Sequence, residues 1–479
     1  MKNQNNPAQT TEPIGAEVLL IGFTGSLGSG CTFISEGIKN ILGDNCRYYR
    51  ISSVLREEAK KRGKKKPTTS YLQDLGNELR TKKLDILAEK TLERIKKDAG
   101  DNPQLYNKDT IILLDGIRND GEVRFFRQFP HFYLISVHAS RETRKGRLVG
   151  DSPQHRFKNE KQFDIANKRD ESEDVTYGQQ VSRCNYLADI IIDNERAISI
   201  AAEAEVSSYI HSIIEKYIKP IQAVHQREEP AADRPPSIDE TLMTMAYCIS
   251  KKSSCLKRKV GTVIAYVESF EKLRGKDPRE DSHIQFQVLS AGYNDVPLGT
   301  IACVFTSYKK CYRDYLKEEQ AKKIRCCWNC GGNIPKNILC PYCEKKNNPV
   351  RTTTCKKCGA TLPTYKCAKC KTNVFEILIA GKEPSQSKFL DMCRSLHAEE
   401  TAIISLAGIN KAGKGELVLY TTTYPCNLCA NKIVAAGIKR VIFAEPYTIK
   451  EAEKILGDAE VRVVKFQGIK STAYFRLYS

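Results

Sequence analysis

Two short motifs in the C-terminal half of the 479-residue chain, H-A-E and P-C-N-L-C, bring together an imidazole, a carboxylate and two thiols. His397, Cys426 and Cys429 would supply three zinc ligands and leave the fourth tetrahedral position open, as catalytic zinc sites require. Zinc lowers the pKa of bound water to about 7, which makes hydroxide available at neutral pH. Glu399 is then spare as a ligand, and we predict that it is the catalytic proton carrier.

The surrounding sequence predicts the elements that hold these groups. H-A-E opens an apolar-periodic helix, and P-C-N-L-C directly follows the apolar strand E-L-V-L-Y-T-T-T. Cys426 and Cys429 would therefore lie at a helix N-terminus, where the helix dipole stabilises thiolates. The alternative is a closed structural zinc site in which Glu399 is incidental.

Short apolar strands alternate with amphipathic helices along most of the chain, which is typical of α/β domains. We predict a disordered lead at 1–15, a first domain with a parallel sheet at 16–220, a linker rich in proline and charge at 221–237, and a second α/β domain at 238–479. A chain of this length favours two or more domains.

In the second domain, the segments G-Y-N-D-V-P, H-A-E-E-T-A-I and T-T-T-Y-P-C-N-L-C-A-N-K resemble the cytidine and deoxycytidylate deaminases. The resemblance implies an α/β/α fold and hydrolytic deamination, with Glu399 passing a proton to the departing amine. It also implies that Asn294 contacts the sugar of the substrate, and that Tyr424 and Tyr447 line its site. Thr401 departs from the family, which usually has asparagine there.

A glycine-rich loop, G-S-L-G-S-G-C-T, follows the first apolar strand and precedes a helix. It fits the phosphate-binding pattern G-x4-G-x-[ST], except that a cysteine stands where lysine is expected. The predicted nucleotide-binding residues are Gly25, Ser26, Leu27, Gly28, Ser29, Gly30, Cys31 and Thr32. Backbone N–H groups of such a loop can still cradle phosphates, and Thr32 can still meet Mg²⁺, but efficient phosphoryl transfer is not expected.

The rest of the first domain resembles nucleotide kinases, so we expect a P-loop kinase-like parallel sheet. Asp115 ends a strand where an acidic residue would support Mg²⁺, and Arg141, Arg144 and Arg147 match the phosphate-facing arginines of a lid. Three roles remain open for this domain: regulatory nucleotide binding, which we favour, a retained scaffold that binds nothing, and an active kinase.

The chain has 19 cysteines, many of them in C-x2-C pairs. The segment 326–371 contains two similar units with the spacing of short zinc ribbons, which predicts two structural zinc ions in addition to the catalytic one. The predicted ligands are Cys327, Cys330, Cys340 and Cys343 for one site and Cys355, Cys358, Cys367 and Cys370 for the other. Interleaved pairing is an alternative, and nucleic-acid or protein binding and bracing of the active-site rim are equally open as roles.

The composition favours some partners and excludes others. A formal net charge of +19 favours nucleotides, nucleic acid or another polyanion. No run of about 18 apolar residues is present, so we expect no membrane span. The polar N-terminus and the metal-type cysteine pattern predict a protein of the reducing cytosol. By analogy with related deaminases, we expect a homo-oligomer.

The fusion of a lysine-less P-loop domain with a deaminase domain resembles the antiviral, anti-phage dCTP deaminases of bacteria. That resemblance implies conversion of dCTP to dUTP, and of dCMP to dUMP, which would deplete dCTP during infection. A nucleotide or nucleic acid would then regulate the enzyme. The alternatives are a housekeeping dCMP deaminase with a regulatory domain, a deaminase that edits polynucleotides, and a catalytically dead zinc protein that binds nucleic acid.

Overall fold

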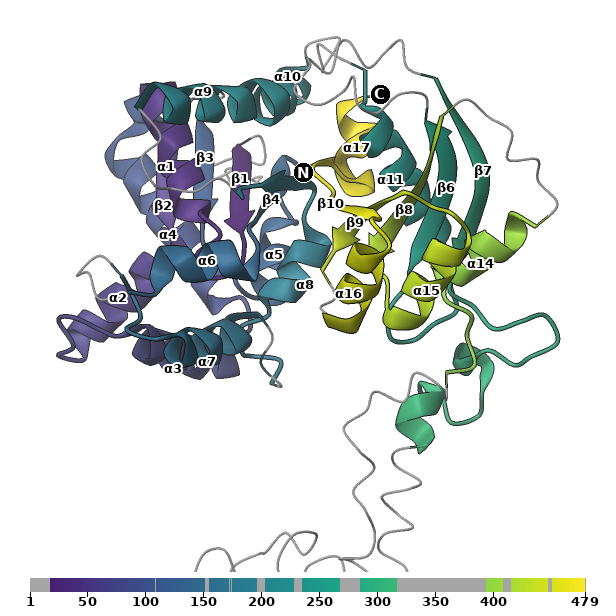
Figure 1. Ribbon diagram of the computed structural model, residues 1–479. Coiled ribbons are helices and arrows are strands. Elements are labelled where there is room, and N and C mark those ends of the chain that lie inside the picture. Colours follow the sequence, from purple (N-terminus) through teal and green to yellow (C-terminus); the bar gives the residue numbers. More distant parts are fainter. Residues whose placement is uncertain are drawn as a thin grey trace, which may run out of the picture.

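The computed structural model describes two α/β units that lie side by side (Figure 1). The described residues are 18–107, 109–150, 155–171, 173, 175–195, 203–227, 235–267, 285–316, 393–407, 415–446 and 450–478. The predicted lead at 1–15 and the predicted double ribbon at 326–371 lie outside these ranges. Among the described helices, none combines the length and the apolar character that crossing a bilayer requires.

The first unit is built on five parallel strands in the order β5-β4-β1-β3-β2. The strands are β1 (Leu19–Thr24), β2 (Cys46–Arg50), β3 (Ile111–Asp115), β4 (Phe132–His138) and β5 (Ile190–Asp193). β1 and β3 are buried along their whole length, as expected for strands covered by helices on both faces. The predicted parallel sheet is thus confirmed.

Helices cover both faces of this sheet. The helices of this unit are α1 (Cys31–Leu42), α2 (Ile51–Lys61), α3 (Thr69–Lys82), α4 (Ile86–Asp101), α5 (Asp120–Phe126), α6 (Arg141–Leu148), α7 (Glu160–Glu171), α8 (Val181–Leu187), α9 (Glu203–Ile213) and α10 (Lys219–Gln226). α6 and α7 pack in a separate small cluster beside the glycine-rich loop. One core packs α1, α9 and α10 against the sheet, and the other packs α2 to α5 against it. α10 ends at Gln226, so helical structure extends into the predicted linker.

The second unit has a mixed five-stranded sheet in the order β10-β9-β8-β6-β7. The strands are β6 (Gly261–Val267), β7 (Phe286–Tyr293), β8 (Glu416–Thr423), β9 (Arg440–Glu445) and β10 (Arg462–Lys465). β8, β9 and β10 are parallel, whereas β6 runs antiparallel to both of its neighbours.

Helices form a layer on each side of this sheet, as predicted for an α/β/α domain. α11 (Ile238–Ser250) packs on one face, and α14 (Ala398–Ser405), α15 (Asn427–Ala435) and α16 (Lys450–Asp458) pack on the other. Ser237 caps α11: its side chain accepts a hydrogen bond from the backbone of Glu240 at 3.2 Å.

The end of the chain leaves the second unit and joins the first. β11 (Gly468–Ile469) pairs antiparallel with β5 and becomes an edge of the first sheet. The following helix, α17 (Ser471–Leu477), buries Ala473 and Leu477 in the core formed by α1, α9 and α10. The sequence analysis predicted consecutive domains and did not anticipate that β11 and α17 pack with the first sheet.

A buried ion pair lies at the joint between the two units. Lys470, which is 1% exposed, places its Nζ 3.1 Å from the carboxylate of Glu445 at the end of β9. The same Nζ donates to the carbonyl of Tyr186 at 2.8 Å, at the end of α8, and the Tyr247 hydroxyl donates to Glu445 at 2.5 Å. Because these partners come from both units, the ion pair fixes the position of one unit against the other.

We predict that Lys470→Ala lowers the free energy of unfolding by about 3–5 kcal/mol, because it leaves the Glu445 carboxylate buried without its cation. Denaturant unfolding of the full chain measures the change. The exposed Lys454→Ala on α16 is the matched control and should be nearly neutral. The double variant Lys470→Met, Glu445→Gln should recover part of the loss, and equal stability of Lys470→Ala and Lys454→Ala would contradict the assigned role.

Candidate active site

The three predicted zinc ligands meet at the N-termini of two neighbouring helices. His397 immediately precedes α14, Cys426 immediately precedes α15, and Cys429 lies in the first turn of α15. The Nδ1 atom of His397 is 3.3 Å from the Sγ atom of Cys426 and 3.3 Å from that of Cys429. Ligand atoms at zinc–nitrogen and zinc–sulfur bond lengths would lie about 3.6 Å apart in a tetrahedron, so the arrangement fits zinc.

The pKa values of the two thiols are shifted in opposite directions. Hydrogen bonds from the Cys429 thiol and from His397 lower the pKa of Cys426 to about 4. The neighbouring Cys426 and burial raise the pKa of Cys429, because two adjacent buried thiolates would repel each other. A divalent cation between the sulfur atoms removes this repulsion and deprotonates both thiols.

Glu399 lies beside the ligand set, in the first turn of α14. Its carboxylate is 4% exposed, accepts a hydrogen bond from the Thr421 hydroxyl at 3.3 Å and lies 3.5 Å from the Sγ atom of Cys429. Burial raises the pKa of Glu399. A carboxyl group that is close to the metal ligands and holds a proton more readily than usual can serve as a general acid and base.

Residues on either side of the H-A-E motif fix the start of α14. The Glu400 carboxylate accepts a hydrogen bond from the backbone N–H of His397 at 3.3 Å and pairs with Lys432 of α15 at 3.1 Å. Thr401, where the deaminase pattern has asparagine, donates to the carbonyl of His397 at 3.1 Å and lies 3.4 Å from that of Tyr293. These contacts tie the imidazole-bearing turn both to α15 and to the end of β7.

Gly292 allows α14 to pack directly on β7. A Cβ atom at this position would lie 2.5 Å from the carbonyl oxygen of Ala398 and 2.5 Å from the nitrogen of Ala402, which are both backbone atoms of α14. Sequence reasoning missed this residue, because its importance depends on which helix crosses the strand.

The predicted substrate residues are placed as follows. Asn294 follows β7; its Oδ1 accepts from the Val260 N–H at 2.7 Å and its Nδ2 donates to the Arg258 carbonyl at 2.9 Å. One lone pair and one N–H of this amide remain for a ligand. Tyr424 follows β8 and packs edge-on against Phe443 with ring centroids 4.9 Å apart. Tyr447 lies outside the described residues. Their contacts with substrate stay predictions.

The glycine-rich loop connects β1 to α1, as predicted. Gly28 and Gly30 have positive φ angles of 85° and 100°, which glycine adopts without strain. Thr32 donates to the Asp115 carboxylate at 2.7 Å, so the two residues predicted to support Mg²⁺ are adjacent. Burial raises the pKa of Cys31 to about 12, which makes this side chain a neutral thiol in the position of the expected lysine.

The predicted lid arginines bind the protein itself. Arg141 pairs with Glu160 at 2.8 Å, and Arg144 donates to the Leu27 carbonyl at 3.2 Å; neither lines the cavity beneath the loop. Arg147 reaches the cavity, but it donates to the carbonyls of Gly28 and Ser29 at 3.1 and 3.2 Å. The guanidinium groups of Arg141 and Arg144 are thus held by side chains and carbonyls of the same domain, and their contact with phosphate stays a prediction.

The known proteins that are similar to this chain fall into two sets, and the first set consists of deaminases. The family model of the cytidine and deoxycytidylate deaminase zinc-binding region matches residues 365–445. Deoxycytidylate deaminase of Schizosaccharomyces pombe is 27% identical over 214 residues, which is 45% of this chain and 39% of the relative. A dCMP deaminase from the cyanophage S-TIM5, solved with dCMP and dUMP, is 18% identical with a TM-score of 0.24, covering 48% of this chain and 98% of that one.

A second set of relatives consists of UPF0200 proteins. A UPF0200 protein of Methanoregula boonei is 30% identical over 165 residues, which is 34% of this chain and 81% of the relative. The fold and the site thus define a fusion of a UPF0200-like P-loop domain with a zinc-binding domain of the deaminase type. By the identity and coverage of the archaeal relative, the chain belongs to the UPF0200 family.

We predict that Gly292→Ala pushes α14 away from β7, displaces His397 and weakens zinc binding at this site. Competition with a chromophoric zinc chelator measures the change, and the affinity should fall about 10-fold or more, as for other residues that orient metal ligands. Gly457→Ala on α16, where a Cβ meets no atom within 4 Å, is the matched control and should bind zinc like the wild type. Unchanged affinity in Gly292→Ala would refute this role.

Proposed function

We propose that the chain is a zinc-dependent deaminase that converts dCTP to dUTP, and dCMP to dUMP, with release of ammonia. The observation that carries this proposal is the position of the buried Glu399 carboxylate, 3.5 Å from the sulfur of Cys429 and next to His397 and Cys426. Zinc bound by these three residues would supply ionised water at neutral pH. Deoxycytidylate deaminases among the relatives support the class of substrate.

Glu399 has two tasks in the proposed reaction. It takes one proton from the attacking water and delivers it to N3 of the cytosine ring. It then takes the second proton from the new hydroxyl group on C4 and delivers it to the amine, so that the C4–N bond breaks and ammonia leaves. The Thr421 hydroxyl donates to Oε1 of Glu399 at 3.3 Å, and Oε2 faces the ligand set, 3.5 Å from the Sγ atom of Cys429. The burial that raises the pKa of Glu399 supports both tasks, because the group must hold the proton between them.

Asn294, Tyr424 and Tyr447 are proposed to contact the substrate. The free lone pair and N–H of the Asn294 amide suit a sugar hydroxyl, which can both donate and accept. Tyr424 is half-buried and follows β8, the strand that leads into the two thiol ligands, so its ring is suited to line the base pocket. The two predicted structural zinc ions and the homo-oligomer remain part of the proposal.

The biological role that we propose is depletion of dCTP as an antiviral defence. Its support is the fusion of the deaminase-type site with a P-loop domain that has lost its lysine, since a deaminase that destroys a DNA precursor needs restraint in healthy cells. A housekeeping dCMP deaminase would instead favour the monophosphate and leave the dCTP pool of its host intact. The two roles therefore differ in substrate preference and in their effect on the cell.

Incubation of the purified full chain with dCTP, dCMP, CTP and a cytosine-containing oligodeoxynucleotide tests the proposed substrates. We expect uracil products from dCTP and dCMP, resolved by chromatography, and little product from the oligonucleotide. A strong preference for dCMP, with no fall in cellular dCTP on overexpression, would support the housekeeping enzyme. Product from the oligonucleotide alone would make the chain a polynucleotide deaminase.

The role of Glu399 has its own prediction. Glu399→Gln should lower kcat by about 10²–10⁴-fold, the usual contribution of general acid–base catalysis, because glutamine cannot carry the proton. Zinc content, measured by mass spectrometry, should not change, because Glu399 is not a ligand. The exposed Glu451→Gln on α16 is the matched control and should keep full activity. A normal rate in Glu399→Gln would refute the proton-carrier role.

A further inference from the structure

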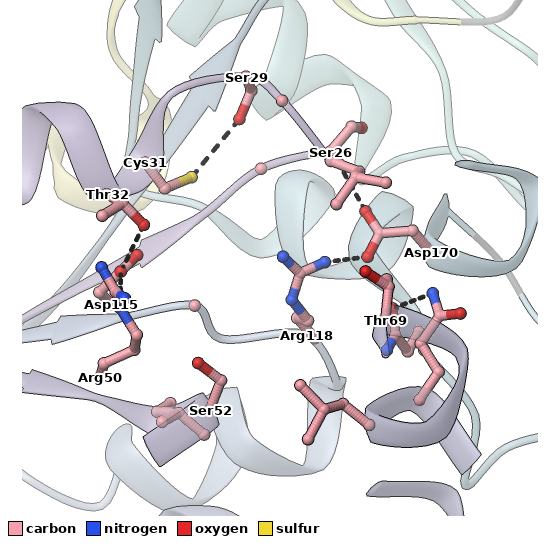
Figure 2. A pocket seen from close by; sticks show the side chains of 18 of the residues that line it. Ser26, Ser29, Cys31, Thr32, Arg50, Ser52, Thr69, Asp115, Arg118 and Asp170 are labelled. Carbon is pink, nitrogen blue, oxygen red and sulfur yellow. Dashed lines mark hydrogen bonds and ion pairs between the residues drawn. The ribbon is translucent and has the colours of Figure 1, made fainter. Parts of the chain in front are cut away.

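A large cavity lies beneath the glycine-rich loop of the first unit, far in sequence from the zinc ligands (Figure 2). Its volume is about 690 Å³, within the range of small-molecule sites. The walls come from the loop itself, from the start of α2, from residues before and within α3, and from the segment after β3. The cavity is therefore large enough for a nucleotide.

Six arginines line this cavity. Arg80 pairs with Glu122, and Arg147 donates to carbonyls of the loop. The other four are Arg50, Arg56, Arg118 and Arg156. Burial and repulsion from the other three lower the pKa of Arg156, so the positive charges are close enough to destabilise each other. In the described part of the chain, neither Arg56 nor Arg156 has a carboxylate within ion-pair distance. Asp115 and Asp170 partly neutralise Arg50 and Arg118, and an anionic ligand among the four arginines would reduce the repulsion that remains.

One carboxylate already occupies part of this site. Asp170 of α7 is fully buried; its Oδ2 accepts a hydrogen bond from the backbone N–H of Leu27 at 2.8 Å, and its Oδ1 pairs with Arg118. Figure 2 shows Asp170 between the loop and Arg118, with the rest of the guanidinium turned toward the cavity. Loop N–H groups of this kind are donors for phosphate oxygens, so Asp170 lies where an anionic ligand would bind.

The other end of the cavity suits a nucleoside. Leu55, Leu72 and Leu87 provide apolar surface, and the buried amides of Gln73 and Gln179 lie 3.4 Å apart. Apolar walls with a few fixed donors and acceptors match the face and the edge of a base. Phosphoryl transfer is not expected, since the Cys31 thiol is neutral and cannot replace the charge of lysine.

We propose that this cavity binds a nucleoside triphosphate, that Arg118 supplies the positive charge missing at Cys31, and that the ligand's phosphate displaces Asp170 from the Leu27 amide. Asp170 is thus an internal competitor that weakens binding until the ligand is abundant. The proposal does not rest on deamination, because the cavity and the zinc ligands belong to different units.

Isothermal titration calorimetry of the full chain with ATP, GTP and dTTP, in the presence of Mg²⁺, tests the site. Inorganic tripolyphosphate is the control ligand, because it has the phosphates but no nucleoside. Asp170→Asn should bind at least one of the nucleotides about tenfold more tightly than the wild type, because the competing charge is gone. Asp164→Asn, a partly buried position on the same helix that pairs with Arg141 and does not line the cavity, is the matched control and should bind like the wild type. Equal affinity of the two variants would overturn the role of Asp170.

Variants of Arg118 complete the test. Arg118→Ala should weaken binding about tenfold or more, and Arg118→Lys should restore part of it because the charge returns. No binding of any nucleotide by the wild type and by Asp170→Asn would overturn the site as a whole. Tripolyphosphate that binds as tightly as the nucleotides would overturn the nucleoside part of the proposal.

Discussion

The zinc-binding geometry depends on the meeting of two helix N-termini. α14 and α15 begin side by side on the same face of the second sheet, so that one imidazole and two sulfur atoms converge within bonding range of a single ion. The Glu400–Lys432 ion pair holds the two helices together, and Gly292 lets the first of them lie against the strand. Both helix dipoles point their positive ends at this place, which favours the thiolates and the carboxylate of Glu399.

The glycine-rich loop of the first unit is fixed in a different way. Its carbonyl groups accept hydrogen bonds from Arg144, Arg147 and Asn194. Since these donors bind carbonyls rather than phosphates, the loop keeps its shape without a ligand. The short helix α8 connects this region to the joint between the two units. The backbone N–H of Gln180, the residue before α8, donates to the carbonyl of Arg118 at 2.8 Å. The last turn of α8 contacts Lys470.

How much the sequence could predict depended on how local each feature is. The zinc ligands and Glu399 were predictable because each half of the motif spans a few residues at the boundary between a strand or loop and a helix. The parallel sheet was predictable because its strands are continuous apolar runs. By contrast, β11 has two residues and no periodicity, and Lys470 looks like any surface lysine until its burial is known.

The cavity illustrates the same limit. Arg50, Arg118 and Arg156 lie far apart in the chain, and only the fold brings them together around one space. No sequence motif marks Asp170, and its contact with the Leu27 amide could not be predicted because it depends on how α7 crosses the loop. The contacts of Arg141 and Arg144 show the complementary limit: the resemblance to kinases placed them near the loop, and only the structure shows which groups of the protein they bind.

The return of β11 and α17 to the first sheet has a consequence for how the protein folds during synthesis. During translation, β5 would emerge with one unpaired edge and with the apolar surface beneath α17 uncovered. Unpaired strand edges invite pairing with other chains. The first unit can therefore complete its fold only after the whole second unit has been synthesised, so its exposed edge and apolar surface stay open to wrong contacts for all of that time.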